Sequence, residues 1–397
     1  MNTELQLESG AAISGDCEPS FQPVARAFAH NFEQRGEVGA SVCIFVAGRK
    51  VVDLWGGHID AAASAPWQRD TVSLVFSCTK AATALCAQLL VDRGLLDLDA
   101  PIAHYWPEFA QNGKQDATVL MALNHSLGLP ALRAPLKTDA YYDWDYMVER
   151  LAAEVPFWAP GSRNGYHMMT FGWTVGELVR RIAGKSLGMF FRDEFAGPLG
   201  LDFWVGLPAE LEDRVAPIIP FVPQPGVPPT AFINALMTDP QSISHLALMN
   251  NGHHVPNSRR AHAAELGGGG GIANARALAR LFEPLANPRR SHPLLSAERI
   301  NAMRRVSVAT ESDQTLLIPT RFAQGFMLRM DNPTLPTGSS LLIGDGAFGH
   351  VGLGGSLVFA DPEHELAFGY TMNRLGGGIL LNERGQGLVD AVYACVA

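Results

Sequence analysis

A serine and a lysine three residues apart give the clearest chemical signal in this chain. They are Ser77 and Lys80, and they follow a short apolar segment at 72–76. On a helix, residues i and i+3 share a face with their Cβ atoms about 5–6 Å apart, so the Lys80 amine would lie against the Ser77 hydroxyl. A serine hydroxyl becomes a good nucleophile when a neighbour takes its proton, and a partly desolvated lysine can do so. The spacing predicts a nucleophilic serine in a first helical turn, where unpaired N–H groups favour an oxyanion.

The scarcity of lysine strengthens this signal. Only five of the 30 basic residues are lysines, and none of the other four has a serine three residues before it. Arginine stays protonated and cannot act as a base, so Lys80 is the lysine whose pKa should matter. The motif alone leaves a competing interpretation open, in which Ser77 is a helix N-cap and Lys80 is a solvated charge.

A second serine motif, at 184–188, matches the Gly-x-Ser-x-Gly pattern of a nucleophile elbow. That elbow requires a buried strand before the serine and a helix after it. Residues 174–183 have the spacing of an amphipathic helix instead, and Gly184 is placed to end it. We therefore expect Ser186 to lie in a loop and Lys185 to be unconnected with catalysis.

The elements that must position Ser77 and Lys80 follow from hydrophobic periodicity and turn residues. Apolar spacing predicts helices at 22–35, 77–93, 174–183, 276–286, 296–305 and 382–397. Two β-rich regions predict hairpins, one around 47–49 and the other at 355–372 with its turn at 361–364.

Strands at both ends of the chain with helices between them predict an α/β (α+β) fold. Its antiparallel sheet would be flanked by helices and completed by both termini, with a large, mostly helical inserted domain. The expected division is an α/β domain whose first part, 1–95, holds the nucleophile helix, a helical insert at 96–305, and the second part of the α/β domain at 306–397.

Composition excludes several classes of protein. The 397 residues carry a net charge of −9, and a surface of that sign repels nucleic acid. No apolar run is long enough to span a membrane, and the first residues lack the pattern of a signal peptide. Five cysteines without paired spacing argue against a disulfide framework and favour a reducing compartment. We expect a cytoplasmic protein with no cofactor and no metal, and a homo-oligomer is left open.

Two other features resemble ligand sites but are better explained as loops. The histidines at 253, 254 and 262 have no acidic or cysteine partners at metal-ligand spacing. The five-glycine run at 267–271 is not followed by the Lys-Ser/Thr of a phosphate-binding loop. We expect ordinary loop histidines and a flexible glycine loop.

Two later segments give the Ser-x-x-Lys motif a context. They are PGSRNGYH at 160–167 and GHVGLGG at 349–355. Together with Ser77 and Lys80, they resemble the serine β-lactamase and penicillin-recognising superfamily, and within it the family VIII carboxylesterases related to class C β-lactamases. The resemblance runs from about residue 20 to the C-terminus and implies a class C β-lactamase-like fold.

The resemblance also implies roles for individual residues. Ser77 would be the acylated nucleophile, with Lys80 and Tyr166 as its acid/base pair. The oxyanion hole would be formed by the backbone N–H groups of Ser77 and Leu353. Substrate binding is implied for His350, Gly352 and His167.

Two departures from the lactamase pattern shape the expected activity. The chain has Tyr166-His167-Met168 where lactamases have Tyr-x-Asn, and it has His350 where their late strand has lysine. These changes remove groups that hold the amide and carboxylate of a β-lactam. We therefore expect a serine carboxylesterase acting on short- to medium-chain acyl esters. The alternatives are a β-lactamase, D-amino-acid peptidase or acyltransferase of the same superfamily, or a non-catalytic member that only binds such ligands.

Overall fold

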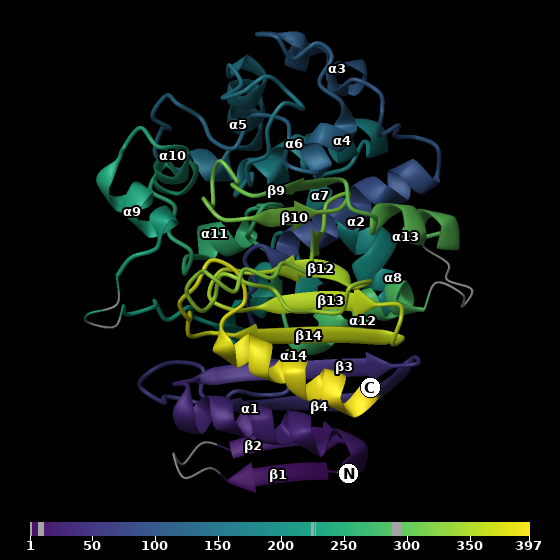
Figure 1. Ribbon diagram of the computed structural model, residues 1–397, viewed down its shortest axis with the longest axis vertical. Helices are drawn as coiled ribbons and strands as arrows, with labels where there is room; N and C mark the ends of the chain where they lie inside the picture. The colour runs from purple at the N-terminus through teal and green to yellow at the C-terminus, as the bar shows by residue number, and fades with distance from the viewer. Residues whose placement is uncertain (1, 7–11, 224–225, 227, 288–294) are drawn as a thin grey trace.

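A ten-stranded antiparallel sheet runs through the molecule (Figure 1). The computed structural model describes residues 2–6, 12–223, 226, 228–287 and 295–397. The strand order is β1-β2-β4-β3-β14-β13-β12-β11-β10-β9. The strands are β1 (Asn2–Gln6), β2 (Ala12–Cys17), β3 (Gly39–Val46), β4 (Arg49–Gly57), β9 (Val308–Thr310), β10 (Thr320–Phe322), β11 (Met327–Leu328), β12 (Phe348–Val351), β13 (Leu357–Asp361) and β14 (Leu366–Met372).

The N-terminal and C-terminal strands meet in the middle of this sheet. β14 pairs antiparallel with β3, in a register that places Thr371 opposite Ser41 and Leu366 opposite Val46. The two expected hairpins are present as β3–β4 and β13–β14. The predicted fold class, with a sheet completed by both ends of the chain, is therefore confirmed.

The central strands β3, β13 and β14 are buried along nearly their whole length because helices cover both faces of the sheet. α1 (Gln22–Gln34) and α14 (Glu383–Val396) lie side by side on one face (Figure 1), and α12 (Ala275–Ala286) packs against the other. Alternate side chains of β3 serve the two layers, since Val42 and Ile44 belong to the α1–α14 core whereas Cys43 and Phe45 belong to the core under α12.

α2 (Cys78–Asp92) carries the candidate nucleophile at its N-terminus and is buried through thirteen consecutive residues, from Cys78 to Leu90. It packs against α6 (Thr170–Ala183), α7 (Leu187–Phe191) and β12. A helix that is mostly apolar and buried on all sides belongs in such an interior position. The strand leading into it, β5 (Val72–Leu74), belongs to a second, four-stranded sheet with the order β6-β8-β5-β7, where β6 is Phe203–Trp204, β7 is Val215–Ala216 and β8 is Ile272–Ala273.

In the sequence, the remaining helices lie between β4 and β9, the strands that end the first half and begin the second half of the large sheet. They are α3 (Ile102–Tyr105), α4 (Val119–Leu123), α5 (Trp144–Ala153), α8 (Gly197–Leu199), α9 (Ala231–Thr238), α10 (Ile243–Met249), α11 (Arg259–Ala263) and α13 (Ala297–Met303). Short 3-10 turns occupy η1 (Pro19–Phe21), η2 (Pro107–Ala110), η3 (Ala140–Tyr142) and η5 (Ala209–Arg214), and η4 (Arg192–Ala196) is a π-helical turn. Within the described ranges, no helix combines the length and apolar character needed to cross a membrane.

All six predicted helices are present, with ends that differ by at most four residues. The largest difference is α6, which begins at Thr170 and not at 174. The domain boundaries stay a prediction, and α12, which they assign to the insert, packs directly on β3, β13 and β14. The proline-rich stretch at 216–229 also predicts a loop, and its residues 224, 225 and 227 lie outside the described residues.

Candidate active site

The structure brings the Ser77 hydroxyl and the Lys80 amine together, with 3.1 Å between Oγ and Nζ. Ser77 occupies the N-cap position of α2, but its side chain makes no capping hydrogen bond. Lys80 is fully buried. The interpretation of this pair as a cap and a solvated charge is therefore wrong. Phe76, just before the serine, has φ +44°, a strained value for a bulky residue and a kind of strain that clusters at functional sites.

The Lys80 amine is held by two backbone carbonyls as well as by Ser77. Its Nζ lies 2.5 Å from the carbonyl oxygen of Met168 and 2.6 Å from that of Gly268. Burial lowers the pKa of Lys80 well below its usual range, so the neutral amine is favoured. A neutral amine has two N–H groups for the two carbonyls, and its lone pair is then left to accept the Ser77 proton.

The glycine run at 267–271 forms one wall of this lysine site. All five residues are buried, and Gly267 and Gly268 offer their carbonyls to Thr83 and Lys80. A Cβ on Gly268 would lie 2.6 Å from the carbonyl oxygen of Met169. The run is irregular as expected, but the expectation of a flexible loop is wrong. Its glycines allow the backbone to approach α2 and α6 closely.

Tyr166 lies over the lysine and is also buried. The centroid of its ring is 4.7 Å from Lys80 Nζ, and the ring stacks on Phe322 of β10 with 6° between the planes. Its hydroxyl is buried and has no hydrogen-bond partner among the described residues. Burial raises the pKa of Tyr166. The nearby Ser77 hydroxyl lowers this pKa only in part, and the two hydroxyls do not meet hydrogen-bond geometry. The phenol therefore keeps its proton.

The turn after β12 lies against the start of α2. A Cβ on Gly352 would meet the carbonyl oxygen of Val75 at 2.3 Å, and the Cys78 thiol lies 3.3 Å from the carbonyl oxygen of His350. The Gly352 N–H is used within the turn, donating to Ser356 at 2.7 Å. Among the described residues, the backbone N–H groups of Ser77 and Leu353 donate no hydrogen bond.

The two predicted substrate-binding histidines differ in how their ring nitrogens are used. His350 Nδ1 lies 2.7 Å from the carbonyl oxygen of Val351, while its buried Nε2 has no partner among the described residues. In His167, Nδ1 contacts the carbonyl oxygen of Gly165 at 2.7 Å and Nε2 accepts the N–H of Leu129 at 3.0 Å. The geometry thus favours a packing role for His167 and leaves a free acceptor on His350.

These histidines are uncharged in the folded protein. Burial lowers the pKa of both His167 and His350 to about 3. A third imidazole, His125, lies with its ring centroid 4.9 Å from that of Tyr166, and burial lowers its pKa as well. The imidazoles beside the tyrosine are therefore neutral.

The sequence decoys lie elsewhere and have other partners. Ser186 caps α7 by accepting the N–H of Met189 and donates to Glu265 at 2.7 Å, while Lys185 pairs with Asp193. The nucleophile-elbow interpretation is therefore excluded, as expected. Within the part of the chain that the structure describes, no group of three or more His, Cys, Asp or Glu side chains is arranged to hold a metal ion.

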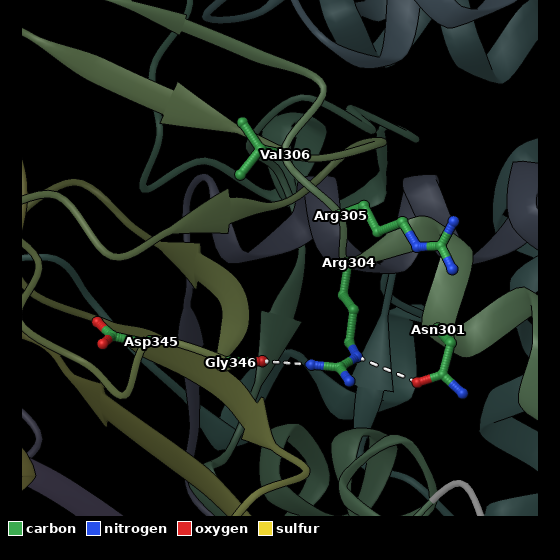
Figure 2. Close-up of a pocket in the computed structure, with 6 residues that line it drawn as sticks. All are labelled: Asn301, Arg304, Arg305, Val306, Asp345 and Gly346. Carbon is green, nitrogen blue, oxygen red and sulfur yellow. Dashed lines mark hydrogen bonds between the residues drawn. The ribbon is translucent and has the colours of Figure 1, made fainter.

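A polar pocket of about 440 Å³ lies apart from this centre and shares no residue with it. Its Arg304 guanidinium reaches between Gly346 and Asn301 and donates to the oxygen of each (Figure 2). These contacts tie up the arginine within the protein. The pocket is lined by Asn301, Arg304, Arg305, Val306, Asp345 and Gly346.

Comparison with known proteins places the chain in a family. The beta-lactamase family profile matches residues 24–388, and the chain therefore belongs to the beta-lactamase family. It is 36% identical to the esterase/beta-lactamase LipL of Mycobacterium tuberculosis over 394 residues, which covers 95% of this chain and 86% of that protein.

Two solved structures are similar over nearly the full length. One, a family VIII carboxylesterase, is 37% identical with a TM-score of 0.85 and covers 96% of this chain and 99% of its own. The other, a penicillin-binding protein homolog from Caulobacter crescentus, is 35% identical with a TM-score of 0.84 and the same coverage. The resemblance stated from the sequence motifs is confirmed.

Proposed function

We propose that this protein is a serine carboxylesterase that hydrolyses short- to medium-chain acyl esters through an acyl-enzyme on Ser77. The observation that carries the proposal is the buried Lys80 amine 3.1 Å from the Ser77 oxygen, with its pKa lowered by burial. Such an amine is an effective base at neutral pH. The names of the similar proteins, an esterase/beta-lactamase and a family VIII carboxylesterase, support the same chemistry.

In the proposed first half-reaction, Lys80 takes the Ser77 proton as the serine oxygen attacks the ester carbonyl carbon. The oxyanion accepts hydrogen bonds from the N–H groups of Ser77 and Leu353, which have no other acceptor among the described residues. One such donor is worth on the order of 10²–10³ in turnover. As the bond to the alcohol breaks, Tyr166 gives its proton to the leaving oxygen, and the Lys80 ammonium restores the phenol.

In the second half-reaction, the same pair takes a proton from water. The water oxygen attacks the acyl carbonyl, and the proton returns to the Ser77 oxygen as the acid leaves. No charged group is needed beside the acyl chain, which agrees with the neutral imidazoles and the aromatic ring of Phe322 beside Tyr166.

The β-lactamase alternative differs at the late strand. The residue at the position of the lactamase lysine is His350, and it is neutral because burial lowers its pKa to about 3. A neutral imidazole attracts a substrate carboxylate far less than an ammonium does. We therefore expect a higher kcat/KM on p-nitrophenyl butyrate than on a chromogenic cephalosporin, and the reverse order would favour the alternative.

We further propose that the protein works in the cytoplasm on a small-molecule substrate. All five cysteines are free thiols, which suits a reducing compartment. The chain has 39 acidic and 30 basic residues, and this excess of negative charge argues against nucleic acid as a partner.

The decisive test replaces the nucleophile. With Ser77→Ala, kcat for p-nitrophenyl butyrate should fall by at least about 10³-fold, and a fluorophosphonate should no longer label the protein. Ser186→Ala is the matched control, because this serine only caps α7 and pairs with Glu265. It should keep wild-type kcat and labelling. Wild-type turnover in Ser77→Ala would refute the assignment.

A further inference from the structure

We propose that Asp313 is a positioning residue that fixes the Tyr166 phenol for ester hydrolysis, an inference that rests on the proposed function. The Asp313 carboxylate is fully buried, and both of its oxygens lie 3.0 Å from the Tyr166 backbone nitrogen. The two residues are 147 positions apart in the sequence. The contact therefore belongs to the tertiary structure and not to a local turn.

The two carboxylate oxygens of Asp313 also accept other hydrogen bonds, and every donor is a neutral group. Oδ1 accepts the N–H groups of Thr315 and Leu316 at 2.8 Å each, and Oδ2 lies 3.3 Å from the Thr320 hydroxyl. Burying a carboxylate is costly unless its oxygens are fully hydrogen-bonded. This carboxylate is therefore the centre of a hydrogen-bonded local structure, and among the described residues Tyr166 is its one partner outside the 313–320 segment.

That local structure links the tyrosine to the main sheet. Asp313 lies in the connection from β9 to β10, whereas Tyr166 lies in the segment before α6. The link is reinforced at Asn164, whose carbonyl accepts the N–H of Gln314 at 3.0 Å. β10 also supplies Phe322, on which the tyrosine ring stacks. One connection thus holds both the backbone and the ring of Tyr166.

The tyrosine depends on this support because nothing holds its reactive end. Lys80 is fixed by two carbonyls and the serine, whereas the Tyr166 hydroxyl has no hydrogen-bond partner among the described residues. The position of the phenol therefore follows from its backbone and its ring. A displacement of about 1 Å at a reacting group can lower the rate by about 10²-fold.

A double-mutant cycle tests the proposal. Asp313→Ala should lower kcat for p-nitrophenyl butyrate by about 30- to 100-fold while KM stays within about twofold. Asp313→Asn should recover most of that loss. Its Oδ1 can still accept the three N–H groups, while its Nδ2 replaces an oxygen 3.0 Å from the Tyr166 nitrogen and 3.3 Å from the Thr320 hydroxyl, so the recovery should be incomplete. In a Tyr166→Phe background, Asp313→Ala should lower kcat by less than about threefold, because its effect passes through the phenol.

A matched control separates positioning from general destabilisation. Asp361 is equally buried and accepts the N–H of Glu363 at 2.9 Å and the Tyr393 hydroxyl at 2.7 Å, so it ties α14 to β13. Asp361→Ala should lower the Tm yet keep kcat within about threefold. Where Asp313→Ala does not fold, Asp313→Ser takes its place in the cycle.

Two results would overturn the proposal. One is an undiminished effect of the Asp313 substitution in the Tyr166→Phe background, which would show that it does not act through the phenol. The other is an equal loss of kcat in Asp361→Ala. Failure of the proposed function itself gives a different result, namely turnover that survives Ser77→Ala.

Discussion

Two lysines of this protein are buried in nearly the same way, and only one of them lies beside a serine hydroxyl. Lys80 and Lys114 are both fully buried. Each donates to two backbone carbonyls, which are those of Met168 and Gly268 for Lys80 and those of Gln111 and Glu154 for Lys114. Each also lies over an aromatic ring, at 4.7 Å from the centroid of Tyr166 and 5.3 Å from that of Phe109, respectively.

Burial and carbonyl contacts are common to both lysines, so these features do not by themselves single out the proposed catalytic one. Burial lowers the pKa of both amines, well below the usual range for Lys80 and to about 8 for Lys114, where the nearby Glu154 opposes the shift. Lys114 therefore remains largely charged at neutral pH and clamps two loops together. Lys80 has the third contact, to Ser77, and this gives the proton of the hydroxyl a destination.

Removing each amine in turn should produce the largest contrast. Lys80→Met should lower kcat for p-nitrophenyl butyrate by at least about 10³-fold, because general-base assistance to the nucleophile is lost. Lys114→Met should lower the Tm and leave kcat within about threefold. Steady-state kinetics and thermal melts on the two variants provide the measurement. If Lys114→Met were as inactive as Lys80→Met, activity would depend on burial and carbonyl contacts of a lysine and not on the contact with Ser77.

Removing the phenol should have the next largest effect. Tyr166→Phe keeps the ring that stacks on Phe322 but takes away the proton donor for the leaving alcohol. We expect kcat to fall by about 10²–10³-fold, within the range of general acid catalysis, with a small change in Tm. Esters of more acidic alcohols need less help in departing, so the loss should be smaller for p-nitrophenyl than for ethyl butyrate. Equal losses on the two esters would contradict the leaving-group role.

Local features of this site were predictable from the sequence, and long-range ones were not. The contact between Ser77 and Lys80 follows from helical spacing alone, and the helix follows from apolar periodicity. Tyr166 and Leu353 came from the family resemblance. The contact between Lys80 and the carbonyl of Gly268, 188 residues away in the sequence, requires a close approach of the backbone. The only sign of this approach in the sequence is a run of glycines.

Asp313 was missed for a related reason. Its role is set by the backbone N–H of a residue 147 positions away, and a backbone donor has no side-chain type that a motif search can find. The glycine run at 267–271 led to a wrong prediction of a flexible loop, because glycine permits both flexible loops and close packing. Only the packing against Met169 and Gly172 decides between the two.

The smallest effect we predict concerns the free energy of unfolding and has an unusual sign. Burial raises the pKa of Asp313 from 3.8 to about 6, so the folded state binds a proton more tightly than the unfolded state. The contribution of this group to stability therefore falls as pH rises from about 4 to about 6 and stays low above that range. Asp313→Asn, which is neutral, should raise the Tm by about 1–3 °C at pH 7.5 and show no gain at pH 4. Calorimetry at the two pH values is the measurement, and a Tm lowered more at pH 7.5 than at pH 4 would mean that the carboxylate is kept for stability and not for positioning Tyr166.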